Sequence, residues 1–261
     1  MTPQSPVAAA ARRDRRAVLF GVIALTSLAW LYTIHLAWQM EVMAGPMTMP
    51  APRSWDAVEL VLLVVMWIIM MVAMMMPSAS PMLLLYTKTL GARVAAPAVL
   101  QRSALFVLGY LAVWAGFSLV AAALQWGLHG AALLSPIMVS SHALLSAGLL
   151  IEAGVYEWSP LKQSCLRRCR SPLGFLLTEW REGGLGAFVM GLRHGLFCVG
   201  CCWALMALLF VTGVMNLVWV VAIAVFVLIE KISPMGDRIA RLAGILMAGY
   251  GLLMLAGMAR G

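Results

Sequence analysis

Charged side chains are scarce in this chain of 261 residues, and their scarcity excludes a soluble globular fold. Lys, Arg, Asp and Glu together make up only 11% of the sequence, against roughly 25% in ordinary soluble domains. Acidic residues number just 10, and histidines just 4. Apolar residues reach 63%, which is more than a soluble fold of this size can hide from water.

Several motifs of common enzyme classes are also missing. The sequence has no glycine-rich phosphate loop, no G-x-S-x-G elbow, no H-E-x-x-H pair and no dinucleotide fingerprint. Internal repeats are not evident either, so the inverted-repeat signature of many transporters is absent. The sequence therefore gives no sign of nucleotide chemistry.

Apolar runs of about 20 residues, by contrast, recur along the whole chain, and a helix of that length crosses a hydrocarbon core of roughly 30 Å. We predict an all-α fold, a polytopic transmembrane bundle of about seven spans that follows a basic tail over residues 1–16. Residues 17–261 form one membrane domain. The expected spans are residues 17–38, 57–76, 103–126, 133–151, 187–212, 214–230 and 239–258. Residues 212–216 are the only polar break between the fifth and sixth spans, and a hairpin is favoured there over one long bent helix.

The positions of the cations predict the orientation, because short cytoplasmic loops collect Lys and Arg. With a cytoplasmic N-terminus and seven crossings, the inner side receives Arg12, Arg13, Arg15, Arg16, Lys88, Arg93, Arg102, Lys162, Arg167, Arg168, Arg170, Arg181, Arg193, Lys231, Arg238 and Arg241. Only Arg53 and Arg260 remain outside. The net charge of +8 therefore indicates topology and contact with the lipid bilayer of a bacterial inner membrane. It is no nucleic-acid footprint, because the cations are spread over several loops with no aromatic platform among them.

Five cysteines lie on or near the predicted cytoplasmic side, where disulfides are disfavoured and thiols more often bind metal or act in redox chemistry. Cys165 and Cys169 are four residues apart, so a short helix between Pro160 and Pro172 would place both thiols on one side. Cys198, Cys201 and Cys202 follow in the fifth span. Two thiol pairs, each one helical turn apart, predict a four-coordinate site.

The fifth span also carries a histidine on the same face as two of its thiols. At 100° per residue, His194, Cys198 and Cys201 fall within about 60° of one another, and Cys202 lies at the edge of that face. A buried packing role is the alternative for these residues, because free cysteine behaves as a small hydrophobe. One histidine and three thiols within nine residues favour metal binding.

Methionine is abundant in the second span, with Met70, Met74 and Met75 close to its expected end at Pro77. Met66, Met70 and Met74 form a row with a spacing of one turn, and a second methionine group lies in the outer loop (Met40, Met43, Met47 and Met49). Thioethers and thiolates favour Cu(I), while thiolates with imidazole also suit zinc or iron. Simple packing is the alternative for the methionine row.

The remaining ionisable groups are expected to be structural. Glu157 closes the fourth span, and a solvated helix end near Arg167 or Arg168 is the favoured interpretation, with a neutralising or relay role as the alternative. Glu230 and Lys231 end the sixth span as an interfacial pair. Charged residues inside a membrane are costly and are often functional, which keeps the second interpretation open.

Three motifs in this order resemble a known bacterial family. They are residues 73–78 (AMMMPS) at the end of a Trp-containing span, residues 159–162 (SPLK) before Cys165 and Cys169, and residues 194–206, from His194 through Cys198, Cys201 and Cys202. Together they are similar to the predicted metal-binding integral membrane proteins known as domain of unknown function 2182. The resemblance covers roughly residues 57–232 and implies metal binding, with no established substrate or reaction.

The sequence therefore predicts a membrane protein that binds a soft transition metal, copper(I) first, for transport or delivery. The metal site is expected near the cytoplasmic face, formed by His194, Cys198, Cys201, Cys202, Cys165, Cys169, Met70, Met74 and Met75. Expected partners are the metal ion and a metallochaperone or metalloenzyme subunit. The alternatives are a membrane redox enzyme or cofactor-assembly factor that uses the same thiols, and a structural or partner-binding membrane subunit.

Overall fold

The computed structural model describes residues 6–43, 57–130 and 143–259, and every regular element within these ranges is an α-helix. This confirms the predicted all-α fold. The helices are α1 (Pro6–Met43), α2 (Ala57–Gly91), α3 (Ala96–Gly130), α4 (Ala143–Tyr156), α5 (Pro160–Arg170), α6 (Pro172–Glu179), α7 (Gly183–Ala207), α8 (Leu209–Thr212), α9 (Leu217–Ile232) and α10 (Gly236–Met258).

Five helical segments are long and apolar enough to cross a membrane: Arg13–Met40, Ala57–Gly91, Ala96–Gly130, Gly183–Thr212 and Gly236–Met258. The apolar helices α4 and α9 are shorter, with 14 and 16 residues, so the count of seven spans stays a prediction. Much of the predicted span 133–151 lies outside the described residues. Large apolar side chains such as Phe20, Leu246 and Leu253 cover the outer surface, as expected of a bundle whose solvent is lipid.

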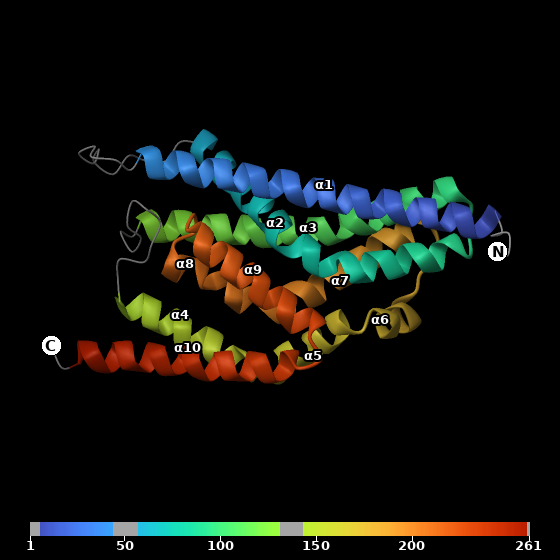
Figure 1. Cartoon of the computed structure of the whole chain (residues 1–261). Coiled ribbons are helices and arrows are strands. Elements are labelled where there is room, and N and C mark those ends of the chain that lie inside the picture. The colour runs from blue at the N-terminus through green and yellow to red at the C-terminus, as the bar shows by residue number, and fades with distance from the viewer. Residues whose placement is uncertain (1–5, 44–56, 131–142, 260–261) are drawn as a thin grey trace.

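The long helices run up and down the bundle in alternating directions (Figure 1). The main packed pairs are α3 with α7, α4 with α10, and α1 with α2. The start of α1 and the end of α10 lie at opposite ends of the molecule. The short helices α5 and α6 lie towards the end at which α1 begins and α2 ends. This is the end at which the sequence predicts most of the Lys and Arg residues.

The helix α2 continues past the point where the sequence predicted its end. The predicted end at Pro77 is wrong, because the helix runs through Pro77 and Pro81 to Gly91. Proline removes an N–H donor and leaves a carbonyl one turn earlier without its partner. The Ser80 hydroxyl donates to the Pro77 carbonyl, which is the group that Pro81 cannot reach. Hydroxyl side chains of this kind let proline persist within membrane helices.

The predicted hairpin between the fifth and sixth spans is confirmed. The helix α7 is followed by the short α8, and the chain reverses before α9 begins (Figure 1). The reversal includes Gly213, which has a φ of 96°, a backbone conformation that residues with a Cβ rarely adopt.

Glycines set the close approach of α3 and α7. A Cβ on Gly109 of α3 would overlap the Phe188 carbonyl of α7, and a Cβ on Gly191 of α7 would overlap the Phe106 carbonyl of α3. Small residues at a helix crossing let two backbones come together in lipid, where packing replaces hydrophobic association. This crossing holds α7, which carries three cysteines, in a defined position against the rest of the bundle.

Candidate metal centre

The short helix α5 carries the first two cysteines and begins with strong local signals. Ser159 is the N-cap and its hydroxyl accepts a hydrogen bond from the Lys162 N–H, while Pro160 occupies the first turn. Arginines in the last turn interact favourably with the negative end of the helix dipole. The predicted helix between Pro160 and Pro172 is therefore confirmed, and Cys165 and Cys169 lie one turn apart on it.

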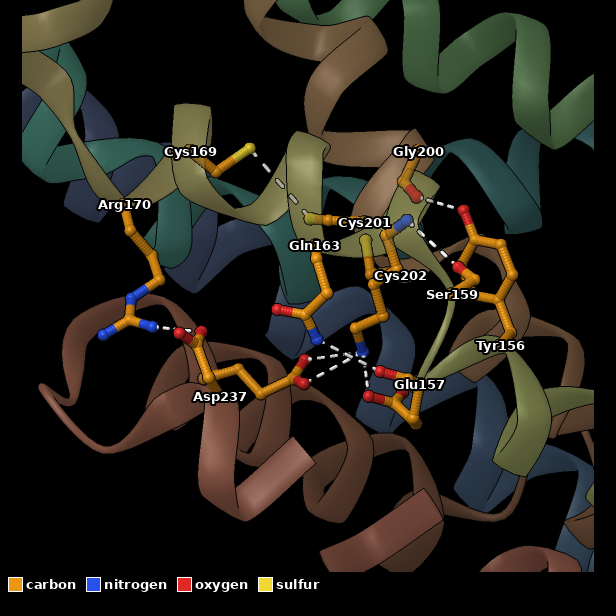
Figure 2. A network of polar contacts seen from close by, with 12 residues as sticks. Tyr156, Glu157, Ser159, Gln163, Cys169, Arg170, Gly200, Cys201, Cys202 and Asp237 are labelled. Carbon is orange, nitrogen blue, oxygen red and sulfur yellow. Dashed lines mark hydrogen bonds and ion pairs between the residues drawn. The ribbon is translucent and has the colours of Figure 1, made fainter. Parts of the chain in front are cut away.

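The structure brings α5 against α7, and two thiols meet there. The Sγ atoms of Cys169 and Cys201 are 4.0 Å apart, with the two side chains directed at each other (Figure 2). Cys165 lies over Gly200, where a Cβ would stand 2.7 Å from its Sγ atom. A single metal ion with bonds of about 2.3 Å holds two sulfurs at most about 4.6 Å apart. The separation of Cys169 and Cys201 is thus within reach of one metal ion.

A second pair of sulfur atoms joins α7 to α2. The Sγ atom of Cys202 lies 3.9 Å from the Sδ atom of Met75, and both side chains are almost fully buried. Cys201 and Cys202 both donate to the Cys198 carbonyl of the same helix. Sulfur donors from three helices, α2, α5 and α7, therefore gather in one region of the bundle.

Cys198 has different partners from the other thiols of α7. The Lys231 ammonium of α9 donates to its Sγ atom at 2.9 Å, and the Tyr110 hydroxyl of α3 lies 3.1 Å from the same sulfur. Lys231 also donates to the Ser78 hydroxyl at 3.0 Å. Lys231 is 8% exposed, so the expected interfacial pairing with Glu230 is wrong. Packing of α9 against α2 buries its last turn instead.

His194 lies one turn before Cys198 and is 3% exposed. Its ring packs among those of Phe106, Tyr110 and Phe175, at centroid distances of 5.4 to 6.0 Å, and its Nδ1 atom has no hydrogen-bond partner in the described structure. Tyr110 contacts the side chains of both His194 and Cys198, so these two residues lie on one face of α7, as predicted.

The other methionines of the candidate site are buried along α2. Met70 and Met74 are at most 1% exposed and belong to the same core as Met75 and the α7 cysteines. Of the methionines predicted as ligands, Met75 is the one with a close sulfur contact in the described structure. Within the outer methionine group, Met47 and Met49 lie outside the described residues.

A buried ion-pair group lies beside the sulfur region. The Lys162 ammonium of α5 pairs with the Glu157 carboxylate, which directly follows α4, and with the Glu230 carboxylate of α9 at 2.9 Å. All three side chains are nearly inaccessible to solvent. The favoured solvated position of Glu157 near Arg167 or Arg168 is therefore wrong, because Glu157 is buried as a partner of the Lys162 ammonium.

The ion-pair group fixes α5 in place. Burial by itself would lower the pKa of Lys162, but the Glu230 and Glu157 carboxylates raise it above its ordinary value, so the ammonium stays protonated at neutral pH. At the other end of α5, Arg170 pairs with Asp237 and donates to the Ser233 carbonyl at 2.7 Å. Both ends of the helix are thus tied to α9 and the start of α10, with Cys165 and Cys169 between them.

Sequence reasoning missed Tyr110 and undervalued Lys162 and Lys231. A tyrosine within an apolar span carries no signal of its own. Lysines next to apolar runs carried a weak signal, because a cation at membrane depth is costly unless it has acceptors. Apart from Glu157, which lies five residues before Lys162, their acceptors Glu230, Ser78 and Cys198 come from other helices, which no local pattern identifies.

The arrangement offers pairs of soft donors, and these pairs do not form a complete four-coordinate site. Within residues 6–43, 57–130 and 143–259, no group of three or more His, Cys, Asp or Glu side chains is arranged to hold a metal ion. The sulfurs approach in twos, Cys169 with Cys201 and Cys202 with Met75. Burial raises the pKa of the Cys165 thiol, so this cysteine is mostly protonated in the absence of metal at neutral pH. Such donors suit a soft cation that accepts few ligands.

Comparison with known protein families finds a match over most of the chain. The model of the PpoB2 family, described as a copper chaperone, matches residues 64–254. The matched range includes all five cysteines, His194 and the α2 methionines from Met66 onward. No curated protein and no solved structure matches the chain.

Proposed function

The chain belongs to the PpoB2 family of copper chaperones, and from that membership we propose that it binds Cu(I) through sulfur where α2, α5 and α7 meet. The family covers a larger part of the chain than the resemblance to domain of unknown function 2182, and it names copper where that resemblance implied only a metal. The five long apolar helices support a chaperone embedded in a membrane. The bacterial inner membrane, with the sulfur region near its cytoplasmic face, is part of the proposal.

The observation that carries the proposal is the 4.0 Å separation of the Cys169 and Cys201 sulfurs, which come from two helices. Thiolates and thioethers select Cu(I) among the available metals, and two sulfurs at this distance can bind one ion without a large movement of either helix. Cys202 and Met75 form the adjoining pair. His194 and Cys198 flank these pairs on α7.

Differences in burial among the cysteines support a route for copper exchange within the site. Cys165 and Cys169 on α5 are partly exposed, whereas Cys198, Cys201 and Cys202 are each 1% exposed. We infer that Cu(I) passes between an outside thiol and the buried pairs through the α5 cysteines. In each step a new Cu–S bond forms as an old one breaks, and copper keeps its oxidation state. Met74 and Met70 extend the row of sulfurs from Met75 along α2. The partner would be a metallochaperone or a metalloenzyme subunit.

Anaerobic copper titration of the protein purified in detergent tests the proposal. We expect the wild-type protein to bind Cu(I) in competition with a chromophoric Cu(I) chelator. Cys169→Ser and Cys201→Ser should each lose the tightest binding, because a serine hydroxyl is a hard donor that stays protonated. Met75→Leu should weaken binding less than either, and Met66→Leu is the matched control for loss of a buried methionine in α2.

Folding is verified by the helical circular dichroism of each variant. If folded Cys169→Ser and Cys201→Ser variants both keep wild-type copper stoichiometry and affinity, the thiol pair is not the site. Haem or iron–sulfur absorption in the purified protein would instead support the redox or cofactor-assembly alternative.

A further inference from the structure

Lys231 places a positive charge inside the sulfur region. Its side chain is 8% exposed, and its Nζ atom donates to Cys198 Sγ at 2.9 Å and to Ser78 Oγ at 3.0 Å. An ammonium has only donors, so Cys198 is the acceptor in this contact. A buried cation is costly in a low-dielectric interior and is tolerated where negative or polar acceptors surround it.

The charge of Lys231 is not cancelled by the acidic residue beside it. Glu230 is the adjacent residue, but its carboxylate pairs with Lys162, as does that of Glu157. In the portion of the chain that the structure describes, no carboxylate lies within ion-pair distance of Lys231. Its hydrogen-bond partners among the described residues are the Cys198 thiol and the Ser78 hydroxyl, and the Tyr110 hydroxyl contacts the same sulfur. The thiols are therefore the groups that can balance its charge.

Resting on the proposed copper function, we infer that Lys231 makes the sulfur site selective for a monovalent soft cation over divalent cations. The reason is net charge. With Cys198 as a neutral thiol, the thiolates of Cys169 and Cys201, one Cu(I) ion and the Lys231 ammonium sum to zero, whereas the same groups with Zn(II) leave a net charge of +1. An uncompensated charge is expensive in a dry interior, and the repulsion from Lys231 is twice as large for a divalent ion at the same position.

Lys231 also limits the number of ligands. A structural zinc site takes four protein donors, and Cys198 is the thiol that would extend the Cys169 and Cys201 pair along α7. Because Lys231 and Tyr110 both contact the Cys198 sulfur, a metal ion must displace them before it can bind there. Two sulfurs suffice for Cu(I), so this restriction affects zinc more than copper.

The test compares metal preference in wild-type protein and in Lys231→Met. Cu(I) affinity is measured with a chromophoric chelator, and Zn(II) affinity by competition with a fluorescent zinc chelator. Thiolate-to-Co(II) charge-transfer absorption reports divalent binding directly. We expect Lys231→Met to bind Zn(II) and Co(II) about tenfold or more tightly than the wild type, with a smaller change for Cu(I). Lys231→Arg, which keeps the charge, should retain the wild-type preference.

A second variant keeps the lysine and neutralises its uncompensated positive charge. Ser78→Asp places a carboxylate at the position that Lys231 already contacts, so the new pair cancels the charge and the variant does not depend on burying an apolar group there. It should raise divalent affinity as Lys231→Met does. Lys88→Met is the matched control, because Lys88 is an exposed lysine near the same end of α2.

The outcomes separate this inference from the proposed function. A wild-type protein that binds no Cu(I) overturns the copper function itself. A wild type that binds Cu(I), together with Lys231→Met and Ser78→Asp variants whose Zn(II) and Co(II) affinities equal those of Lys88→Met, overturns the role of Lys231 and leaves the copper function intact.

Discussion

Lys162 is the residue on which the position of α5 depends most. Its ammonium is the shared partner of two buried carboxylates, Glu157 before α5 and Glu230 on α9. Removing the lysine would leave two acidic groups in a dry interior without a cation, and breaking a buried ion pair in this way costs about 3–5 kcal/mol. The cysteines of α5 are held near α7 by this group.

We therefore expect Lys162→Met to lower both the stability and the copper content of the protein. The midpoint of thermal unfolding in detergent, followed by circular dichroism, should fall well below that of Lys88→Met, which removes an exposed lysine. Copper bound per protein should fall as well, because α5 loses one of its two anchors and Cys169 moves away from Cys201. Equal midpoints and equal copper contents in the two variants would show that the ion-pair group does not position α5.

At the scale of the helix, the crossing of α3 and α7 decides where the three α7 cysteines lie. Gly109 and Gly191 face the backbone of the opposite helix, so no side chain separates the two elements. Tyr110, the residue after Gly109, thereby reaches both Cys198 and the Met75 carbonyl, the latter at 3.2 Å. The glycines thus act on the sulfur region through the distance between helices.

Gly191→Ala should be clearly destabilising, because its Cβ would overlap the Phe106 carbonyl and the backbone cannot rotate out of the way. Overpacking of this kind costs typically about 1–3 kcal/mol. Gly116→Ala on α3 is the matched control, since a Cβ there meets nothing within 4 Å. The comparison is made by thermal unfolding in detergent, and indistinguishable midpoints for the two variants would contradict the close crossing.

At the scale of the whole molecule, the cation-rich ends of the helices are linked to one another. Arg93 at the α2–α3 turn pairs with Glu182 before α7 at 3.3 Å, and Arg170 of α5 pairs with Asp237 of α10. Exposed pairs of this sort add little stability. Their value is topological, because they confirm that segments far apart in sequence share one end of the bundle, where a cytoplasmic location of the cations is expected.

Reporter fusions test the orientation. A reporter fused before α1 should be active in the cytoplasm, and one fused after residue 261 in the periplasm, because α1 begins and α10 ends at opposite ends of the bundle. The control is a fusion in the α5–α6 region, which should behave as the N-terminal fusion does. A cytoplasmic signal from the C-terminal fusion would require an even number of crossings and would overturn the seven-span prediction.

The sequence by itself determined the features that arise from local pattern. Apolar runs of membrane length, the SPLK start of α5 and the polar break before α9 each act within a few residues, so the class of fold, the α5 helix and the hairpin at Gly213 were predictable. The one-turn spacings of the cysteines likewise follow from helix geometry alone. The prolines of α2 misled the prediction, because the Ser80 hydroxyl takes up the carbonyl that Pro81 leaves without a donor and the helix continues.

Only the tertiary structure decided which donors meet. The contacts of Cys169 with Cys201, of Cys202 with Met75, and of Lys231 with Cys198 join residues at least 32 positions apart. Such contacts depend on how α2, α5, α7 and α9 pack, and the helical period of each segment does not contain that information. The same holds for charge: Glu157 and Lys162 have the composition of a solvated helix end, and they are buried because α9 supplies the partner that makes burial tolerable.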